Sequence, residues 1–400
     1  MLIASFSLFI ALALPYESIS NQPPSLDSLE ESIDAYARFE ENQFLPSQQH
    51  SFSYQVIASM PHTLKEYEYA SGNWFGGRDT LKDHGIEPSV TYTADIVGNP
   101  VGGIHPKGSA YADQIVFACL LKTEELFGWH GGYFLMSAFQ RDGQSLSQNN
   151  IGNEFLIQRV YTGETIHWQE LSYEQKFWDD HASFKLGRTA ANEDFCTSPL
   201  YLYYMNKGID SYPRALAVNA NYSTSRRTYW GSRLKADLSS STVARLGVYQ
   251  VTTPSINGLN WDFYPGDGVM VLGQYEWNPE FFKPSPLPVN ADKSASTSEV
   301  VKQEDSRDPS RDTPASKPIL KGLNGHYWMG GYYSTWEYPQ FNSKIQASNS
   351  YALYWHADQM VYRADPLRDE GLVLWSVFVL SPQENISLIP LQINSGAIYT

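Results

Sequence analysis

Apolar and polar residues alternate along much of the chain from Ile86 onward. In the clearest run, residues 89–96, apolar side chains take every second position and polar side chains fill the positions between them. The same alternation returns at 171–177 and at 233–237. Because successive side chains of a strand point to opposite faces, this pattern predicts strands with one apolar and one polar face.

Further strand-like runs follow, and turn residues such as Gly, Asn, Asp and Pro separate nearly all of them. Together they predict about a dozen antiparallel strands with almost no helix between them, a pattern typical of a large barrel or a sandwich. These runs are 114–121, 133–140, 183–188, 243–251, 269–277, 327–336, 351–362, 372–380 and 386–399.

Strand length favours the barrel over the sandwich. Several runs reach ten or more residues, as crossing a bilayer at a tilt requires, whereas strands of globular sheets are most often about 5 or 6 residues long. A membrane barrel turns its apolar face to lipid and its charged face to a water-filled lumen. We therefore predict an all-β fold, a large antiparallel transmembrane β-barrel formed by residues 71–400.

The alternation also assigns a direction to individual side chains. Those predicted to face outward are Tyr92, Tyr173 and Leu234, and those predicted to face inward are Thr91, Glu174 and Arg233. Trp328 and Trp336 lie eight positions apart and are expected on the outer face, in the two aromatic girdles. Trp168 shares its parity with the charged face, so it points into the lumen unless a bulge intervenes.

Two segments precede the predicted barrel. Residues 1–20 contain an apolar run followed by small residues, which indicates a signal peptide, with a buried N-terminal helix as the alternative. In residues 21–70, apolar positions recur at helical spacing up to about Phe44 and give way to a Gln-, Ser- and Pro-rich stretch. This segment is expected to be a helical arm and linker, either a solvated appendage or a partial plug.

The segment 283–321 differs from everything around it. It contains no aromatic residue and is rich in Pro, Ser, Asp, Glu and Lys. This composition predicts a disordered insertion that carries no chemistry. We expect it on the extracellular side, which would place the long connection at 252–267 on the opposite side.

Composition narrows the function further. The chain has 400 residues, 42% of them hydrophobic, so it can bury a large apolar surface. Its net charge of −15 argues against nucleic acid as a partner. The aromatic share of 14% suits membrane-interface girdles or sugar-stacking surfaces. Cys119 and Cys196 are too few for a disulfide framework and have no metal-site spacing.

Charged residues on the polar faces are the candidate lumen lining. Acids and bases facing each other across a constriction create a transverse field and offer donors and acceptors to sugar hydroxyls. The alternative for each residue is an ordinary solvated lumen position. The candidates are Glu170, Glu174, Lys176, Lys185, Arg188, Arg233, Asp237, Asp358 and Arg363.

Catalytic patterns are weak. Glu193 and Asp194 could be read as a carboxylate pair, but adjacent residues of a strand point to opposite faces and cannot act together. The histidines show no metal-ligand spacing, and we find no phosphate loop and no Gly-x-Ser-x-Gly motif. We predict that the chain is not an enzyme and needs neither cofactor nor metal.

Several motifs in chain order resemble the carbohydrate-selective porin family of the OprB type. The matching segments are 72–78 (Gly-Asn-Trp-Phe-Gly-Gly-Arg), 84–86, 127–132 (Phe-Gly-Trp-His-Gly-Gly), 149–153, 171–177, 186–188, 193–195 and 357–363. The resemblance implies a sixteen-stranded barrel in the outer membrane, through which small sugars such as glucose diffuse passively. Family chains continue beyond the strand that resembles 394–400, so C-terminal strands are expected to be missing here.

Two other functions compete with this prediction. A secreted carbohydrate-binding β-sandwich would hide the apolar faces between two sheets, and a barrel used for adhesion would transport nothing. Outer-membrane lipid and a monosaccharide or small oligosaccharide are the partners expected for a porin. The sequence does not distinguish a monomer from a trimer.

Overall fold

The computed structural model describes residues 70–161, 165–225, 227–252, 267–283, 321–365 and 369–399. The expected signal peptide at 1–20, nearly all of the arm and linker at 21–70, and the insertion between residues 283 and 321 lie outside this part of the chain.

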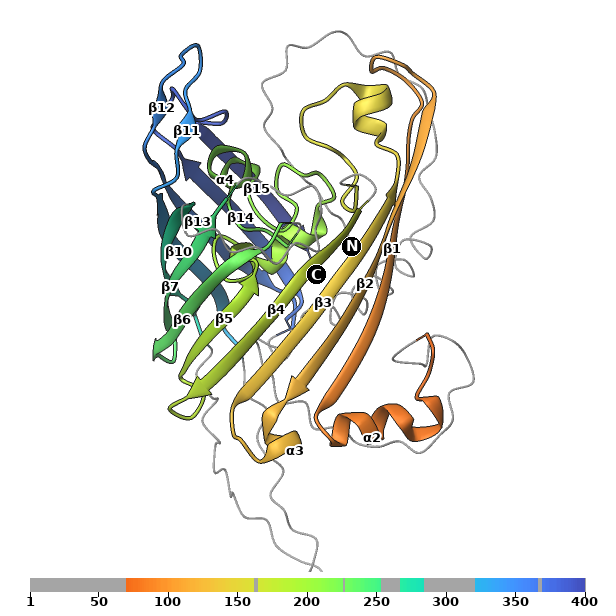
Figure 1. Cartoon of the computed structure of the whole chain (residues 1–400), viewed down its shortest axis with the longest axis vertical. Helices are drawn as coiled ribbons and strands as arrows, with labels where there is room; N and C mark the ends of the chain where they lie inside the picture. The colour runs from red at the N-terminus through yellow and green to blue at the C-terminus, as the bar shows by residue number, and fades with distance from the viewer. Residues whose placement is uncertain are drawn as a thin grey trace, which may run out of the picture.

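The described strands form one antiparallel sheet whose order follows the sequence (Figure 1). Apart from the short β9, which pairs with β10, each wall strand pairs with the next wall strand along the chain. The wall strands are β1 (Ile86–Asn99), β2 (Gly108–Lys122), β3 (Gly132–Gly143), β4 (Thr165–Phe177), β5 (Ala182–Thr189), β6 (Tyr229–Ser239), β7 (Thr242–Val251), β8 (Gly268–Trp277), β9 (Glu280–Phe281), β10 (Leu323–Ser334), β13 (Ser350–Arg363), β14 (Gly371–Leu380) and β15 (Leu391–Tyr399).

This sheet confirms the all-β fold and the strand runs. It contains 13 described strands, and the number sixteen stays a prediction. The described strands do not form two stacked sheets, as the sandwich alternative requires; apart from the small pair β11 (Tyr338–Pro339) and β12 (Gln346–Ala347), they belong to a single curved wall (Figure 1). None of the helices in the described part has the length and apolar character needed to cross a membrane.

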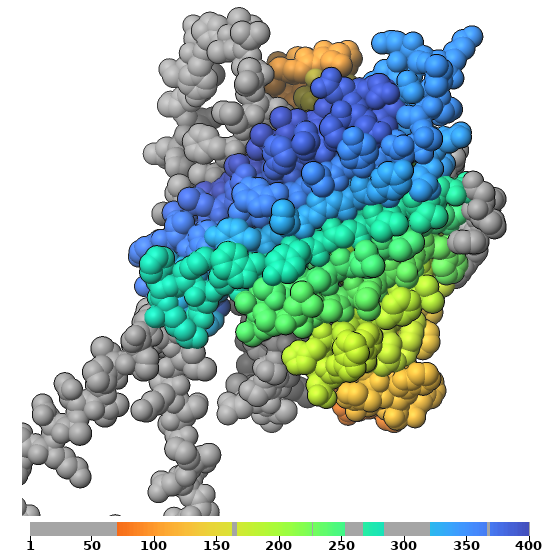
Figure 2. Space-filling model, turned by 90° about the vertical axis from the view of Figure 1, so that its left-hand side faces the viewer, coloured from red at the N-terminus to blue at the C-terminus, as the bar shows by residue number. Residues whose placement is uncertain are grey.

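The outer face of the wall is apolar, as the alternation predicts. Tyr92 is 53% exposed and Leu234 is 45% exposed. In contrast, Thr91, Glu174 and Arg233 line an internal cavity. Figure 2 shows the outer face of the later strands, which lie obliquely side by side. Large apolar side chains that stay exposed along a continuous face suit contact with lipid.

Tyr173 also lies on the outer face, because of its register. It pairs with Phe134 of β3 and Leu186 of β5, and both of these partners are exposed. A register shift between Ser137 and Ala138 leaves an extra residue in β4, so that Trp168 pairs with Ala138 on the outer side. The bulge therefore removes the apparent conflict between Trp168 and the charged face.

The expected Trp328–Trp336 girdle is wrong. Trp328 is only 2% exposed and stacks on His356 inside the wall, while Met329 and Tyr333 take the outward positions of β10. Trp336 lies beyond the end of β10 and packs against the buried core. The eight-residue spacing matched the girdle geometry, but the parity of β10 places Trp328 inside.

A long connection between β5 and β6 folds into the lumen, and we call residues 190–228 the infolded segment (Figure 1). It contains the short helices η4 (Ala191–Glu193), η5 (Pro199–Tyr203) and α4 (Arg214–Ala220). Apolar residues of this segment form one core with inward residues of β7, β8, β10, β13, β14 and β15. The lumen is therefore filled by a packed apolar core on that side.

The two ends of the wall differ in the length of their connections. One end, the short-turn end, carries α2 (Gly77–Asp83), which precedes β1, and α3 (Thr123–Phe127). Its connections are 123–131, 178–181, 240–241 and 364–370. Lys283 and Lys321 also lie at this end, because they follow β9 and precede β10. The infolded segment starts from the opposite, long-loop end.

Candidate functional site

A cavity of about 260 Å³ lies between the inner faces of β1–β6 and the infolded segment. The wall contributes the polar positions of its alternating strands, including Thr91 of β1 and Gln114 of β2. The infolded segment contributes Asn192, Thr197 and Ser211. The side of the lumen that the apolar core does not fill therefore keeps a space whose walls carry both polar and aliphatic side chains, among them Leu120 and Leu135.

Five charged residues form an ion network on one side of this cavity. Lys185 Nζ lies 3.1 Å from Asp194 and 3.4 Å from Glu170. Arg233 lies 2.9 Å from Asp194 through Nε and 3.0 Å from Glu174 through Nη2. All five residues line the cavity, and we call them the charge network.

Strand register places two cations next to each other in the charge network, and Asp194 lies between them. Glu174 pairs with Lys185 across β4 and β5, and Lys185 pairs with Arg233 across β5 and β6. Two like charges directly opposite each other in a sheet are destabilising. Asp194 of the infolded segment offers one carboxylate oxygen to each cation, so it offsets their repulsion.

Asp194 is held in the ionised state by its neighbours. Burial opposes ionisation of Asp194, but Arg233 and Lys185 lower the pKa of its carboxyl below the ordinary value of 3.8. Glu170 accepts hydrogen bonds from Ser172 at 2.6 Å and from Thr189 at 3.3 Å. These bonds fix the carboxylates in position rather than leaving them as mobile surface charges.

The expectation that Glu193 and Asp194 lie on a strand and point to opposite faces is wrong. They do not lie on a strand, because Glu193 ends helix η4 and Asp194 is the next residue. Both line the cavity. The alternation rule fails here because the chain leaves the sheet after Thr189.

The other predicted lining residues lie away from the cavity or face elsewhere. Lys176 and Asp237 are inward positions near the short-turn end, where Lys176 approaches Asp180 at 3.8 Å and Asp237 approaches Lys235 at 3.4 Å. Arg363 donates to the Gly322 carbonyl at 2.7 Å and pairs with Asp369.

Arg188 departs from the predicted inward direction. It lies directly opposite Leu171 in register and shares a face with the exposed residues Phe184 and Leu186. Its Nε donates a hydrogen bond to Thr228 Oγ1 at 3.1 Å. Strand alternation therefore places Arg188 with the outer face, because a polar residue type alone does not fix the direction of a side chain.

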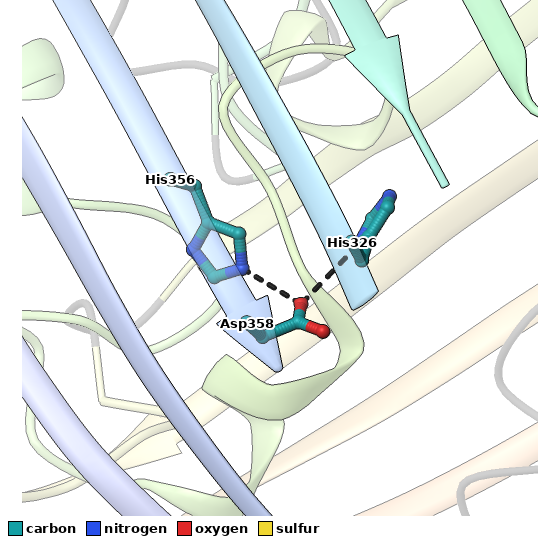
Figure 3. Close-up of side chains that lie close together, drawn as sticks. All are labelled: His326, His356 and Asp358. Carbon is teal, nitrogen blue, oxygen red and sulfur yellow. Dashed lines mark hydrogen bonds and ion pairs between the residues drawn. The ribbon is translucent and has the colours of Figure 1, made fainter. Parts of the chain in front are cut away.

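Asp358 is an inward residue on the far side of the lumen. It lies between two histidines, with His356 Nε2 at 2.9 Å and His326 Nδ1 at 3.3 Å (Figure 3). His356 and Asp358 are two positions apart on β13, and His326 of β10 is the register partner of Asp358. The His-x-Asp pattern was visible in the sequence, but the pairing that adds His326 was not.

Comparison with known proteins decides the family. The family model of the carbohydrate-selective porins, the OprB family, matches residues 106–399 of this chain. The chain belongs to this family. The description of this family is that of carbohydrate-selective porins, a class of channels and not a class of enzymes.

Two relatives support this assignment. Porin B of Pseudomonas aeruginosa is 23% identical over 241 residues, which is 56% of this chain and 52% of the relative. The chain therefore spans about half the length of that curated relative. The high-pH structure of OprB from Pseudomonas putida is similar to this chain with a TM-score of 0.68 and 20% identity, covering 84% of this chain and 75% of the other. This likeness supports the fold, the β-barrel of porins.

The lumen of this OprB-family chain is asymmetric. Opposite the cavity, the infolded segment is fixed to the wall by Tyr201, whose hydroxyl lies 2.7 Å from His356 Nδ1, and by the Cys196 amide, which donates to Gln274 at 2.8 Å. Tyr201 also packs against Trp375. Residue patterns did not predict this segment, because these contacts join positions 78 and 155 residues apart in the sequence.

Proposed function

We propose that this chain is an outer-membrane channel through which monosaccharides such as glucose diffuse passively, along the cavity beside the infolded segment. The observation that carries the proposal is the charge network on the wall of a cavity inside a sheet whose outer face is apolar. Family membership supports the carbohydrate as cargo.

The size of the cavity favours a single sugar ring. Its volume of about 260 Å³ lies just below the roughly 300–1,000 Å³ of pockets that enclose drug-sized ligands. A trisaccharide would have to pass in an extended conformation. A narrow space next to a fixed segment therefore favours monosaccharides.

The charge network supplies the chemistry of selection. Carboxylates accept and ammonium or guanidinium groups donate, so a sugar that carries hydroxyls in pairs finds both kinds of partner. Of the sequence candidates, Glu170, Glu174, Lys185 and Arg233 line the cavity. We assign sugar contact to these four residues together with Asp194.

We also propose an orientation in the membrane. In outer-membrane barrels, short turns face the periplasm and long loops face outward. This rule places the short-turn end, with Lys283 and Lys321, on the periplasmic side. The insertion between them would then be periplasmic, which reverses the extracellular position expected from its composition alone.

Liposome swelling tests the proposed function. Purified protein in liposomes should pass glucose much faster than a trisaccharide and should not hydrolyse either sugar. Protein that has inserted, as shown by a gel mobility that changes on boiling, but gives no size-dependent swelling would contradict the proposal. Protein that stays soluble without detergent would favour the secreted carbohydrate-binding alternative instead.

A further inference from the structure

Three side chains of metal-binding type meet on the inner face of β10 and β13. His326, His356 and Asp358 each offer one donor atom, and the three donor atoms lie within 4.8 Å of one another. Figure 3 shows the two imidazole rings on either side of the Asp358 carboxylate. The register of the two strands brings them together, because His326 pairs with Asp358 and His356 precedes it by two positions on the same face.

The surroundings of His356 fix which nitrogen faces the cluster. Its Nδ1 lies 2.7 Å from the Tyr201 hydroxyl, so Nε2 points to Asp358. The Trp328 ring stacks on the imidazole with 4.8 Å between centroids and 15° between planes. Histidines that bind metals use their second ring nitrogen for such a hydrogen bond, which orients the ring and fixes the tautomer.

We propose that His326, His356 and Asp358 bind one divalent transition-metal ion, with Zn²⁺ as the best-suited ion. Two imidazoles and one carboxylate suit zinc and its neighbours, whereas Ca²⁺ and Mg²⁺ prefer sites made of oxygen atoms. Water would complete the four-coordinate site. The ligand atoms are His356 Nε2, His326 Nδ1 and an oxygen of Asp358.

The distances suit this assignment. Donors about 2.0–2.2 Å from a tetrahedral zinc ion lie roughly 3.3–3.6 Å apart. The two nitrogen-to-carboxylate separations are 2.9 and 3.3 Å. The His326 separation lies in this range, whereas the His356 separation of 2.9 Å is shorter and has to lengthen slightly. The three donor atoms lie within 4.8 Å of one another, and rotation of His326, which is 31% exposed, can bring its nitrogen to the distance that the ion requires. His356 is fully buried and stays in place.

The proposal is independent of sugar passage. The cluster lies on β10 and β13, and none of its three residues lines the cavity beside β1–β6. A failure to transport glucose would therefore not contradict the proposed metal site. The competing interpretation is a purely structural hydrogen-bonded cluster, in which Asp358 accepts from both imidazoles and no ion is bound.

Measuring zinc binding to the full chain distinguishes a metal site from a purely structural hydrogen-bonded cluster. The protein, purified without a histidine tag and stripped with a chelator, should bind one Zn²⁺ per chain by calorimetry in the presence of excess Mg²⁺. Co²⁺ in place of Zn²⁺ should give the visible absorption of a four-coordinate site. Absence of both signals in the folded wild-type protein would overturn the proposal.

Three variants test the residues. His326→Asn removes a partly exposed ligand and should weaken Zn²⁺ binding by more than the roughly 10–100-fold that follows loss of an outer hydrogen-bonding partner. Tyr201→Phe removes such a partner and should weaken binding by about 10–100-fold. His181→Asn, in the exposed turn after β4, is the matched control and should bind as wild type does. Folded His326→Asn protein with wild-type affinity, or an equal loss in His181→Asn, would contradict the site.

Discussion

Arg233 of β6 and Asp194 of the infolded segment lie 2.9 Å apart, and both side chains are buried. This ion pair joins the barrel wall to the segment that narrows the lumen. Because Asp194 also approaches Lys185 at 3.1 Å, one carboxylate connects the segment to two neighbouring strands. On the side of the cavity, the infolded segment is therefore held to the wall by charges, whereas its other side is held by the apolar core.

Replacing Asp194 with Asn should destabilise the protein. The change keeps the size of the side chain and removes the charge that faces Lys185 and Arg233. Hydrogen bonds to charged groups contribute about 1.5–3 kcal/mol each, and Arg233 keeps its bond to Glu174, so a loss near the lower value is expected. Urea unfolding in detergent measures it, with Asp79→Asn in helix α2 as the control. Equal stability of Asp194→Asn and wild type would contradict the role of the pair.

The effect of Asp194 should depend on pH. The pKa of its carboxyl is lowered in the folded protein, so its contribution to stability is present above the ordinary value of 3.8 and is lost as pH falls through the lower, folded value. The difference in unfolding free energy between wild type and Asp194→Asn should therefore be constant near neutral pH and shrink below about pH 3.8. A difference that does not change over this range would assign the stabilisation to packing instead of charge.

Glu174→Gln should alter ion selectivity more than folding. It removes one negative charge from the cavity wall, while Arg233 retains Asp194 as a partner. The reversal potential in a salt gradient should shift toward anions, since Arg233 and Lys185 are then less well compensated. Glu124→Gln, in the exposed helix α3, changes the same charge outside the lumen and should leave the potential unchanged. The same shift in both variants would indicate a general surface effect.

Outward and inward positions should respond differently to charge. Leu234 is exposed on the outer face, and an Arg at a lipid-facing position near the bilayer centre costs about 2–4 kcal/mol. Leu234→Arg should therefore reduce the fraction of protein that inserts and shows heat-modifiable mobility. The adjacent inward substitution Lys235→Arg keeps its charge and should insert normally. Equal insertion of the two variants would contradict lipid contact of this face.

Removing residues 284–320 and joining the flanking chain by a short Asn-Gly turn tests the prediction that the insertion is dispensable. Strands β8, β9 and β10 keep their pairing in this design. Membrane insertion and glucose flux should stay within about twofold of wild type, because the flanking residues Lys283 and Lys321 are exposed at one end of the wall, where changes of chain length are tolerated. Loss of flux with normal insertion would show that the segment shapes the channel.

The sequence predicted the wall well because a strand's alternation is local. Residues 89–96 fix their own facing, and Leu234 and Arg233 follow the same rule. The alternation rule failed at positions whose direction depends on how neighbouring strands are paired. Trp328 was placed outside since its spacing to Trp336 suited a girdle, and Arg188 was placed inside because it is charged.

The infolded segment escaped prediction for a different reason. Its short helices carry no strong periodicity, and its direction depends on partners such as Gln274 and His356, which lie far along the chain. The same limit applies to the histidine cluster. The sequence shows His356 and Asp358 two positions apart, but only the pairing of β10 with β13 brings His326 next to them.

The hydrogen bonds that anchor the infolded segment to the wall also bear on the order of folding. Its Tyr201 meets a residue 155 positions later, and the amide of Ala215 donates to Gln392, 177 positions later. Contacts of such large separation form slowly, because the loop must close before they stabilise it. These two contacts can form only after β13 and β15 have joined the sheet, so we expect the infolded segment to be fully anchored late in folding.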